Sequence, residues 1–344
     1  MPDQAPLVRA DDISVRFISR RSLFGRPREV VQALTGVTIE IARGESLGLV
    51  GESGSGKSTL ARAILRLVEP SAGKVTFDTS DITHQSGSRL KAYRRRVGVV
   101  FQSPYSSLNP AWKVEDLIAE PLRVHRLASG TELRERVVQV LEQVGLDRSH
   151  LRRLSSSFSG GQQQRLAIGR AIATRPDLLV CDEAVSALDA STRAQVLNLL
   201  VRLQRELDLA ILFISHDLAV VRAVTSRIAV MYLGRLVEQG PSAEVVERPL
   251  HPYTAALTSA SPSLTMKSGM PRILLEGDIP SPIALPKGCS FAGRCPLAMQ
   301  VCRSETPRLR RFGSRQVACH LHEEGSESRG HSVASLMQKS IRLR

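Results

Sequence analysis

Long apolar runs are missing from this sequence. No stretch approaches the eighteen or so consecutive apolar residues that a membrane-spanning helix needs. The first residues, MPDQAPLVRADD, also lack the order of a signal peptide, in which basic residues precede an apolar core. A hydrophobic share of 42% and a mean hydropathy of −0.07 fit a well-packed soluble protein. We therefore expect a cytosolic chain.

Acidic residues are in short supply: 33 Asp and Glu stand against 47 Lys and Arg, so the formal net charge is +14. This balance suits phosphates, nucleic acid or an anionic membrane surface, and a basic solvated surface is an equal alternative. The sequence has no heptad run, the pattern that would predict a coiled coil. The length of 344 residues predicts one large domain with an extension, or two domains.

Short apolar segments alternate with helical patterns, which predicts an α/β fold with a parallel sheet and crossover helices. The expected buried strands are 46–51, 97–102, 178–183 and 210–215. The expected crossover helix carries one apolar face made of Val196, Leu199, Leu200, Leu203 and Leu207. Residues 110–157 predict an inserted helical lobe. Pro, Gly and Cys become frequent beyond a boundary at 240–265, and the last twenty or so residues are expected to be mobile for most of their length.

The segment GESGSGKST follows an expected strand and precedes an expected helix, which is the context of a phosphate-binding loop. Its glycines allow backbone N–H groups to turn toward phosphates, and the helix start adds a favourable dipole. Lys57 is expected to reach the β- and γ-phosphates, and the Ser58 hydroxyl is expected to bind Mg²⁺. The nucleotide-binding residues predicted here are Gly51, Glu52, Ser53, Gly54, Ser55, Gly56, Lys57, Ser58 and Thr59.

The segment LLVCDE delivers two carboxylates to the end of an apolar strand. An acidic pair in that place is costly without a cation. We expect Asp182 to hold Mg²⁺ and Glu183 to act as the base for the attacking water.

Six short motifs follow one another along residues 10–240: GESGSGKST, Gln102 at a strand end, FSGGQQQR, LLVCDE, SALD and SHD. Their order and spacing resemble those of ABC-type ATPase domains. The resemblance implies a RecA-like core with a β subdomain and an inserted α-helical subdomain. In that family the SGGQ segment begins a helix that covers the nucleotide held by a second subunit. The residues expected to do so here are Ser159, Gly160, Gly161 and Gln162, so the implied active unit is a head-to-tail dimer with ATP at its interface.

The resemblance assigns four further residues. Gln102 is expected to contact Mg²⁺ and the attacking water. Asp189 is expected to cross the dimer interface, and it can also cap the helix that follows. His216 resembles the histidine that contacts the γ-phosphate. Phe17 matches the aromatic residue that stacks on adenine, and Phe24 competes with it for this role.

Two positions depart from the family pattern. Ala184 stands where the family usually has Pro, and Phe158 stands where Leu is commoner. We expect only small local effects, because the carboxylates remain and Phe158 keeps an apolar anchor. With Lys57, Glu183 and His216 intact, the resemblance implies an active ATPase.

Segments outside the nucleotide site indicate which branch of the ABC family this chain resembles. FQSPYSSLNP, RPLHPYTAAL and the Cys-containing tail resemble the ATPase subunits of bacterial dipeptide and oligopeptide importers, and nickel importers share much of the pattern. The implied partners are a second ABC ATPase subunit, generally a paralogue, two transmembrane permease subunits and a solute-binding protein. The chain is expected at the cytoplasmic face of the membrane as a peripheral subunit. The cargo, peptide, nickel or another small solute, is left open.

The resemblance also implies a division of the chain. The ABC-type nucleotide-binding domain is expected at 1–245, with its helical subdomain at about 103–165. A C-terminal extension of the oligopeptide-importer type is expected at 246–325, and a flexible tail at 326–344.

Four of the five cysteines lie in that extension with the spacing C-x5-C-x6-C-x16-C: Cys289, Cys295, Cys302 and Cys319. A cytosolic location argues against disulfides. Four thiolates can hold Zn²⁺ or a [4Fe–4S] cluster, and unliganded thiols are a third possibility. The resemblance favours the iron–sulfur cluster. Cys181, inside an expected strand, is predicted to be a small buried hydrophobe.

Two other classes of protein are disfavoured. A soluble ABC ATPase that acts on nucleic acid or ribosomes would suit the positive charge, but such proteins generally carry two cassettes or a long insertion, and this chain has neither. A regulatory subunit with a decayed site is opposed by the intact motifs. We expect no nucleic-acid partner.

Overall fold

A computed structural model describes residues 5–18, 29–103, 107–261, 272–323 and 332–339. The chain forms two compact units. The first contains residues 1–8, 41–46 and 77–214, and the second contains residues 9–40, 47–76 and 215–344. None of the helices in the described parts of the chain is long and apolar enough to cross a membrane.

The first unit contains the parallel strands β6 (Val97–Val100), β7 (Leu178–Asp182) and β8 (Ala210–Ser215). These strands confirm three of the expected segments. Their residues are apolar and mostly buried, as in a sheet that is covered on both faces. The crossover helix α7 (Ala190–Leu207) buries Val196, Leu199, Leu200 and Leu203, whereas Leu207 is only half-buried.

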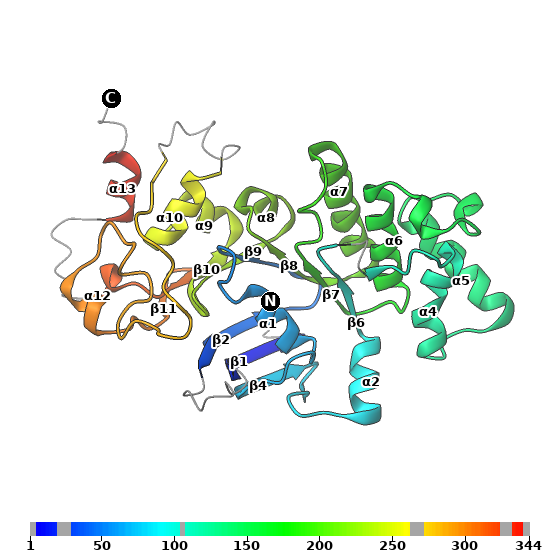
Figure 1. Ribbon diagram of the computed structural model, residues 1–344, viewed down its shortest axis with the longest axis horizontal. Coiled ribbons are helices and arrows are strands. Elements are labelled where there is room, and N and C mark those ends of the chain that lie inside the picture. Colours follow the sequence, from blue (N-terminus) through cyan, green and yellow to red (C-terminus); the bar gives the residue numbers. More distant parts are fainter. Residues whose placement is uncertain (1–4, 19–28, 104–106, 262–271, 324–331, 340–344) are drawn as a thin grey trace, which may run out of the picture. The chain divides into compact units, whose positions relative to one another are not determined.

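The expected helical lobe is present in the first unit. It consists of α4 (Val114–Val124), α5 (Gly130–Gln143) and the start of α6 (Gly160–Ile172), with the short helices η1 (Arg148–His150) and η2 (Ser155–Ser157) between them. Helices α4, α5 and α6 pack on one another (Figure 1). The unit also holds α2 (Gly87–Arg95) and β5 (Ser80–Asp81).

The second unit begins with β1 (Val8–Ile18) and β2 (Val30–Ile41), and β4 (Ala72–Phe77) follows β1 in the sheet order β2-β1-β4. Its other strands run β11-β12-β10-β9-β3. Strand β3 (Ser46–Val50) is parallel to β9 (Arg227–Tyr232), which pairs antiparallel with β10 (Arg235–Pro241). The helices are α1 (Lys57–Ile64), α8 (Leu218–Val224), α9 (Ser242–Glu247) and α10 (Pro252–Ser259).

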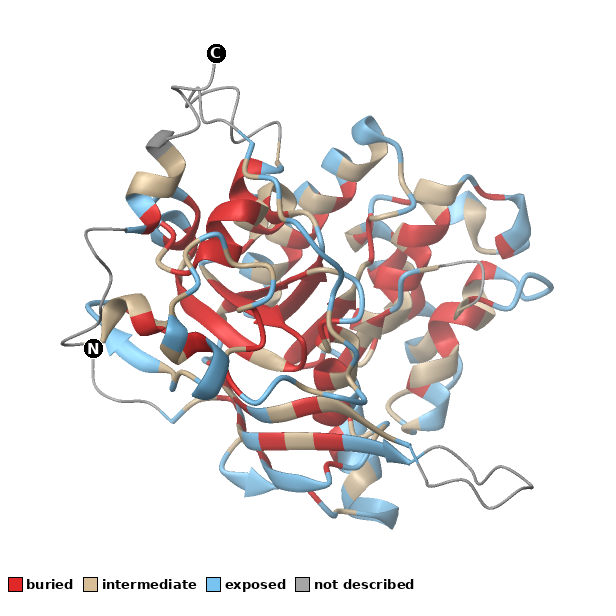
Figure 2. Ribbon diagram, turned by 60° about the vertical axis from the view of Figure 1, so that its left-hand side comes forward, coloured by how far each residue is buried: buried red, intermediate tan, exposed pale blue. Residues whose placement is uncertain are grey.

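The C-terminal residues extend the second unit. Two short strands that the sequence did not predict, β11 (Arg310–Phe312) and β12 (Arg315–Val317), join the sheet, and β12 pairs with β10. Helices α12 (Gln300–Ser304), η3 (His320–His322) and α13 (Val333–Lys339) complete the segment. Part of the expected flexible tail is therefore helical, while residues 326–331 and 340–344 lie outside the described residues. Buried residues concentrate on strands and on the inner faces of helices (Figure 2).

An aromatic cluster lies in the core of the second unit. The ring centroids of Tyr232 and Tyr253 are 4.8 Å apart, and those of Tyr232 and Phe291 are 5.2 Å apart. All three side chains are almost fully buried. Since Tyr253 and Phe291 both come from the C-terminal extension, this segment shares one hydrophobic core with β9.

His251 beside this cluster makes stability sensitive to pH. Burial lowers the pKa of His251 to about 3, with a smaller contribution from His322. Below about pH 6.5 the His251 imidazole is protonated in the unfolded chain but stays neutral in the folded chain. The free energy of unfolding therefore falls by about 1.4 kcal/mol per pH unit. This loss ends near the folded-state pKa. Urea unfolding at pH 7 and pH 5 measures it, and His251→Asn, which keeps an acceptor for the Tyr253 N–H, is expected to reduce the pH dependence. An unchanged dependence in that variant would contradict the assignment.

Candidate active site

The loop between β3 and α1 has the geometry of a phosphate cradle. Gly51 has φ 153° and Gly56 has φ 100°, a region that favours glycine. A Cβ atom at Gly51 would lie 2.2 Å from the carbonyl oxygen of Met231, and one at Gly56 would lie 2.7 Å from that of Ala33. The loop therefore depends on glycine at both positions, as expected for a backbone that turns its N–H groups toward a ligand.

Lys57 lies across this loop. Its side chain is buried, and Nζ donates hydrogen bonds to the carbonyl oxygens of Gly51 at 2.7 Å and Glu52 at 2.9 Å. Ser58 and Thr59 follow in the first turn of α1 and are half-buried. A cation fixed beside a glycine-rich turn at a helix start suits a polyphosphate.

In the first unit, Asp182 ends β7 and Glu183 follows it. The Nε2 atom of Gln102 donates to the Glu183 carboxylate at 3.0 Å. Glu183 has φ 50°, an unusual conformation for a non-glycine residue, and its N–H donates to the Ile214 carbonyl at 3.0 Å. The structure thus brings together the predicted base and the predicted glutamine. Ala184 is buried directly after them.

The SGGQ segment begins α6 with a reciprocal cap. The Ser159 hydroxyl accepts from the Gln162 N–H at 3.4 Å, and the Gln162 side chain accepts from the Ser159 N–H at 3.1 Å. Gly160 and Gly161 follow in the first turn of the helix. Phe158, the apolar anchor, is buried beside His150.

Asp189 caps α7, as predicted. Its carboxylate accepts from the Thr192 N–H at 2.9 Å and from the Ser191 hydroxyl at 2.7 Å. The Thr192 N–H, followed by the other hydrogen bonds, holds the pKa of Asp189 well below its usual range. Because its pKa is lowered, this carboxylate stays ionised at neutral pH.

Gly161 packs against α7 without room for a side chain. A Cβ atom there would lie 2.2 Å from Cγ2 of Thr192. We expect Gly161→Ala to lower the free energy of unfolding by about 1–3 kcal/mol, the usual cost of overpacking. Adding Thr192→Ala, which removes the clashing methyl group, is expected to recover most of the loss. Thermal unfolding of the two single variants and the double variant tests this; no recovery in the double variant would contradict it.

The remaining predicted residues lie in the second unit. His216 is exposed immediately after β8, and Phe17 is 44% exposed on β1. Phe24 lies outside the described residues.

The four C-terminal cysteines lie near one another in the second unit. The Cys289 N–H donates to the Cys302 carbonyl oxygen at 2.8 Å. Burial, with a smaller contribution from the other thiols of the set, raises the pKa of the Cys295 and Cys319 thiols to about 12. Among the described residues, however, no three His, Cys, Asp or Glu side chains are arranged to hold a metal ion. The predicted iron–sulfur or zinc site therefore has no support from the placement of these side chains. Cys181 is fully buried, as expected for a small hydrophobe.

Sequence reasoning missed two residues that contact the phosphate loop, Tyr253 and Arg294. They lie about two hundred residues or more from the loop in the chain, and the only signal was the position of Arg294 between two cysteines.

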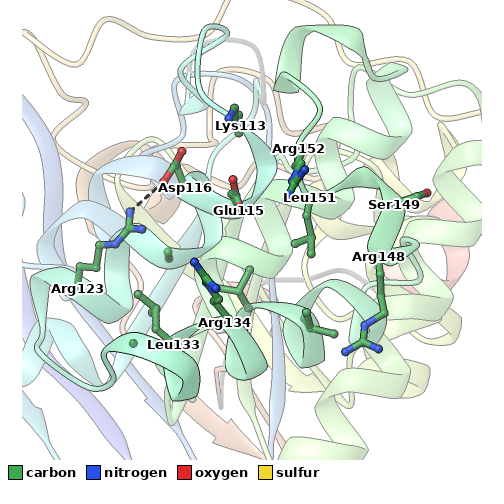
Figure 3. A pocket seen from close by; sticks show the side chains of 14 residues that line it. Lys113, Glu115, Asp116, Arg123, Leu133, Arg134, Arg148, Ser149, Leu151 and Arg152 are labelled. Carbon is green, nitrogen blue, oxygen red and sulfur yellow. Dashed lines mark hydrogen bonds and ion pairs between the residues drawn. The ribbon is translucent and has the colours of Figure 1, made fainter.

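A polar pocket of about 1010 Å³ lies elsewhere, in the helical lobe (Figure 3). Among its lining residues are five cations and two carboxylates: Lys113, Arg123, Arg134, Arg148, Arg152, Glu115 and Asp116. Asp116 pairs with Arg123 at 3.1 Å. None of the described lining residues belongs to the predicted nucleotide site, so the pocket is separate from that chemistry.

Comparison with known proteins identifies the family. The sequence profile of the ABC transporter family matches residues 34–186, and that of the oligopeptide/dipeptide transporter C-terminal region matches residues 237–302. The di/tripeptide transport ATP-binding protein DppF of Pseudomonas aeruginosa (strain UCBPP-PA14) is 47% identical over 315 residues, which cover 92% of this chain and 97% of DppF. This chain belongs to the ABC transporter family. As an ATP-binding subunit of that family it is an ATPase that binds ATP and Mg²⁺.

Other ABC proteins agree with this membership. The oligopeptide transport ATP-binding protein AppF of Bacillus subtilis (strain 168) is 43% identical over 93% of this chain and 98% of AppF. The solved structure of cbiO1 from Clostridium perfringens, part of the ABC transporter complex cbiONQ, has a TM-score of 0.62 and 28% identity and covers 71% of this chain and 92% of cbiO1. The ATP-binding cassette MJ0796, solved as a dimer bound to ADP and Pi, has a TM-score of 0.61 and 29% identity and covers 68% of this chain and 98% of the cassette. These matches confirm the predicted ABC ATPase fold.

Proposed function

We propose that this chain is the ATP-hydrolysing subunit of an importer for dipeptides or oligopeptides. The observation that carries the proposal is the similarity to DppF over 92% of the chain, which includes the C-terminal region as well as the cassette. The nickel-importer alternative shares the same motor role and differs in its cargo.

The proposed site residues divide into three roles. Lys57 and the loop around it bind the phosphates, while Ser58, Gln102 and Asp182 hold Mg²⁺. Glu183 accepts a proton from the attacking water, and Gln102, which is already hydrogen-bonded to that carboxylate, helps to position the water. His216 contacts the γ-phosphate, and Phe17 stacks on adenine. The metal ion draws charge from the β- and γ-phosphates when it is bound.

The proposed active unit contains two cassettes. Ser159, Gly160, Gly161 and Gln162 lie at the start of α6, and the positive end of the helix dipole there suits the γ-phosphate of an ATP bound to another subunit. The second cassette is a paralogue, so the motor is a heterodimer. Asp189 lies at its interface. The motor acts on two permease subunits at the cytoplasmic face of the membrane and receives its cargo from a solute-binding protein.

The division of the chain remains part of this proposal. Residues 1–245 form the nucleotide-binding domain, with the helical subdomain at about 103–165. Residues 246–325 form the extension.

We also propose that Cys289, Cys295, Cys302 and Cys319 hold a [4Fe–4S] cluster, with Zn²⁺ as the alternative. The proposal rests on the donor type alone, because four thiolates can hold either group, whereas the described side chains are not arranged around a metal ion. Assays of iron, sulfide and zinc, with visible absorbance on anaerobically purified protein, distinguish the two. Metal-free protein with four reactive thiols would overturn the proposal.

Reconstitution in liposomes tests the transport function. The chain is purified with its permease, paralogue and solute-binding partners, and uptake is measured with a panel of labelled peptides and with nickel. Peptide-dependent uptake that requires ATP is the expected result. ATP-driven uptake of nickel alone would replace the peptide cargo, and the absence of ATP-driven uptake of any solute would overturn the importer function.

A further inference from the structure

Glu52, the second residue of the phosphate loop, is held by an arginine from the C-terminal extension. Arg294 donates to both carboxylate oxygens of Glu52, with distances of 2.6 Å from NH1 to Oε2 and 3.1 Å from NH2 to Oε1. The Arg294 side chain is only 10% exposed and that of Glu52 is 28% exposed. Two parallel bonds of this kind fix orientation as well as distance.

The backbone of the same residue is held as well. The Glu52 N–H donates to the Tyr253 hydroxyl at 2.8 Å. Tyr253 is fully buried in the aromatic cluster with Tyr232 and Phe291. Both contacts come from residues outside 34–186, the part of the chain that matches the ABC transporter profile.

Arg294 is itself fixed by its surroundings. The backbone N–H of Arg294 donates to the Phe291 carbonyl oxygen at 3.0 Å, and the Phe291 ring packs on Tyr232. The guanidinium carbon lies 5.9 Å from the centre of the Tyr232 ring. The arginine therefore presents a pre-oriented fork to Glu52, and little side-chain freedom is lost when the pair forms.

This pair has two effects on the loop. A free carboxylate at Glu52 would repel the phosphates of a nucleotide, and Arg294 neutralises it. The Glu52 carbonyl oxygen also accepts from Lys57 Nζ at 2.9 Å, so holding Glu52 holds the partner of the phosphate-binding lysine. A loop fixed before the ligand arrives binds with a smaller entropy cost.

We propose that Arg294 is a positioning residue for nucleotide binding, which acts through Glu52 and makes the C-terminal extension part of the phosphate site. This rests on the proposed role of residues 51–58 in binding ATP phosphates. The alternative is an ordinary ion pair that only attaches the extension to the second unit. Only the positioning role predicts that the folded protein binds MgATP more weakly when the pair is lost.

The test is a double-mutant cycle on the full chain, with MgATP affinity measured by calorimetry and ATPase rates measured alongside. Arg294→Ala is expected to raise the Kd for MgATP by about tenfold, which is less than the loss usual for truncating a charge that touches the ligand, because the pair acts on the nucleotide only through the loop. Glu52→Gln is expected to raise the Kd by a smaller factor, because it releases the loop but also removes the carboxylate that would repel the phosphates. The double variant is expected to bind no more weakly than Arg294→Ala alone, because Arg294 acts only through Glu52. In Arg294→Ala the value of kcat at saturating ATP is expected to stay within about twofold of wild type, since Arg294 does not touch the reacting atoms.

Two further variants complete the design. Arg294→Lys keeps the charge but not the fork, and an intermediate Kd is expected. Arg303→Ala removes an exposed arginine from the same extension and serves as the matched control with an unchanged Kd. Because Glu52→Gln leaves the cysteine segment untouched, a loss of affinity in this variant arises at the loop and not in the extension.

The inference is overturned if folded Arg294→Ala, or folded Arg294→Lys where the alanine variant does not fold, binds MgATP with the wild-type Kd, even if it melts at a lower temperature. Additive losses in the double variant would also overturn it, since Arg294 would then not act through Glu52. Wild-type protein without measurable MgATP binding would instead refute the proposed role of residues 51–58.

Discussion

Replacing Glu183 with Gln is expected to lower the rate of ATP hydrolysis by about 10²–10⁴-fold, the usual contribution of a general base. The amide has nearly the same shape as the carboxylate and can still contact Gln102, but it cannot accept a proton from water. The variant is expected to keep its affinity for ATP and to stay closed on its partner cassette. Phosphate release, together with the nucleotide that co-elutes with the complex, measures both effects.

Glu206→Gln is the matched control for this variant. Glu206 is exposed on α7 and lies 3.5 Å from Arg202, so its loss changes the same charge without affecting the site. Undiminished steady-state ATPase in Glu183→Gln would show that another group is the base.

The second large effect is expected at Lys57. Lys57→Met keeps the length of the side chain and removes its charge, so the Kd for MgATP is expected to rise by about 100-fold, within the range for losing a buried partner of a charged ligand. The hydrogen bonds to the Gly51 and Glu52 carbonyl oxygens are lost at the same time. Titration with a fluorescent ATP analogue measures the affinity. The control is Lys113→Met, because Lys113 is exposed in the helical lobe; equal losses in both variants would contradict a specific role for Lys57.

The parts of the site that the sequence predicted follow from local rules. Strands β6 and β7 are parallel, with Val100 opposite Cys181. Residues that follow these two strands emerge at the same edge of the sheet, which is why Gln102 and Glu183 meet. The phosphate loop needs only glycines, a lysine and a helix start, all within a few residues.

The parts that the sequence did not predict depend on distant partners. Arg294 and Glu52 are separated by 242 residues, and no local pattern indicates their pairing. Strands β11 and β12 have three residues each and are rich in arginine, so they lack an apolar alternation. Arg315, for example, is buried because its guanidinium lies near Glu238, Glu244 and the Arg248 carbonyl oxygen. Tertiary contacts determine these elements, and a single sequence does not reveal them.

The order in which the ribosome makes the chain gives the second unit a particular folding history. Strand β3 is synthesised early, but its parallel neighbour β9 begins only at Arg227, and the first unit is synthesised almost entirely between them. Residues 77–214 can therefore become compact first, whereas the pairing of β3 with β9 forms only when the last third of the polypeptide is synthesised. A nascent chain that ends before Arg294 would have an ATP loop without this support, so its affinity for nucleotide is expected to be lower than that of the finished protein.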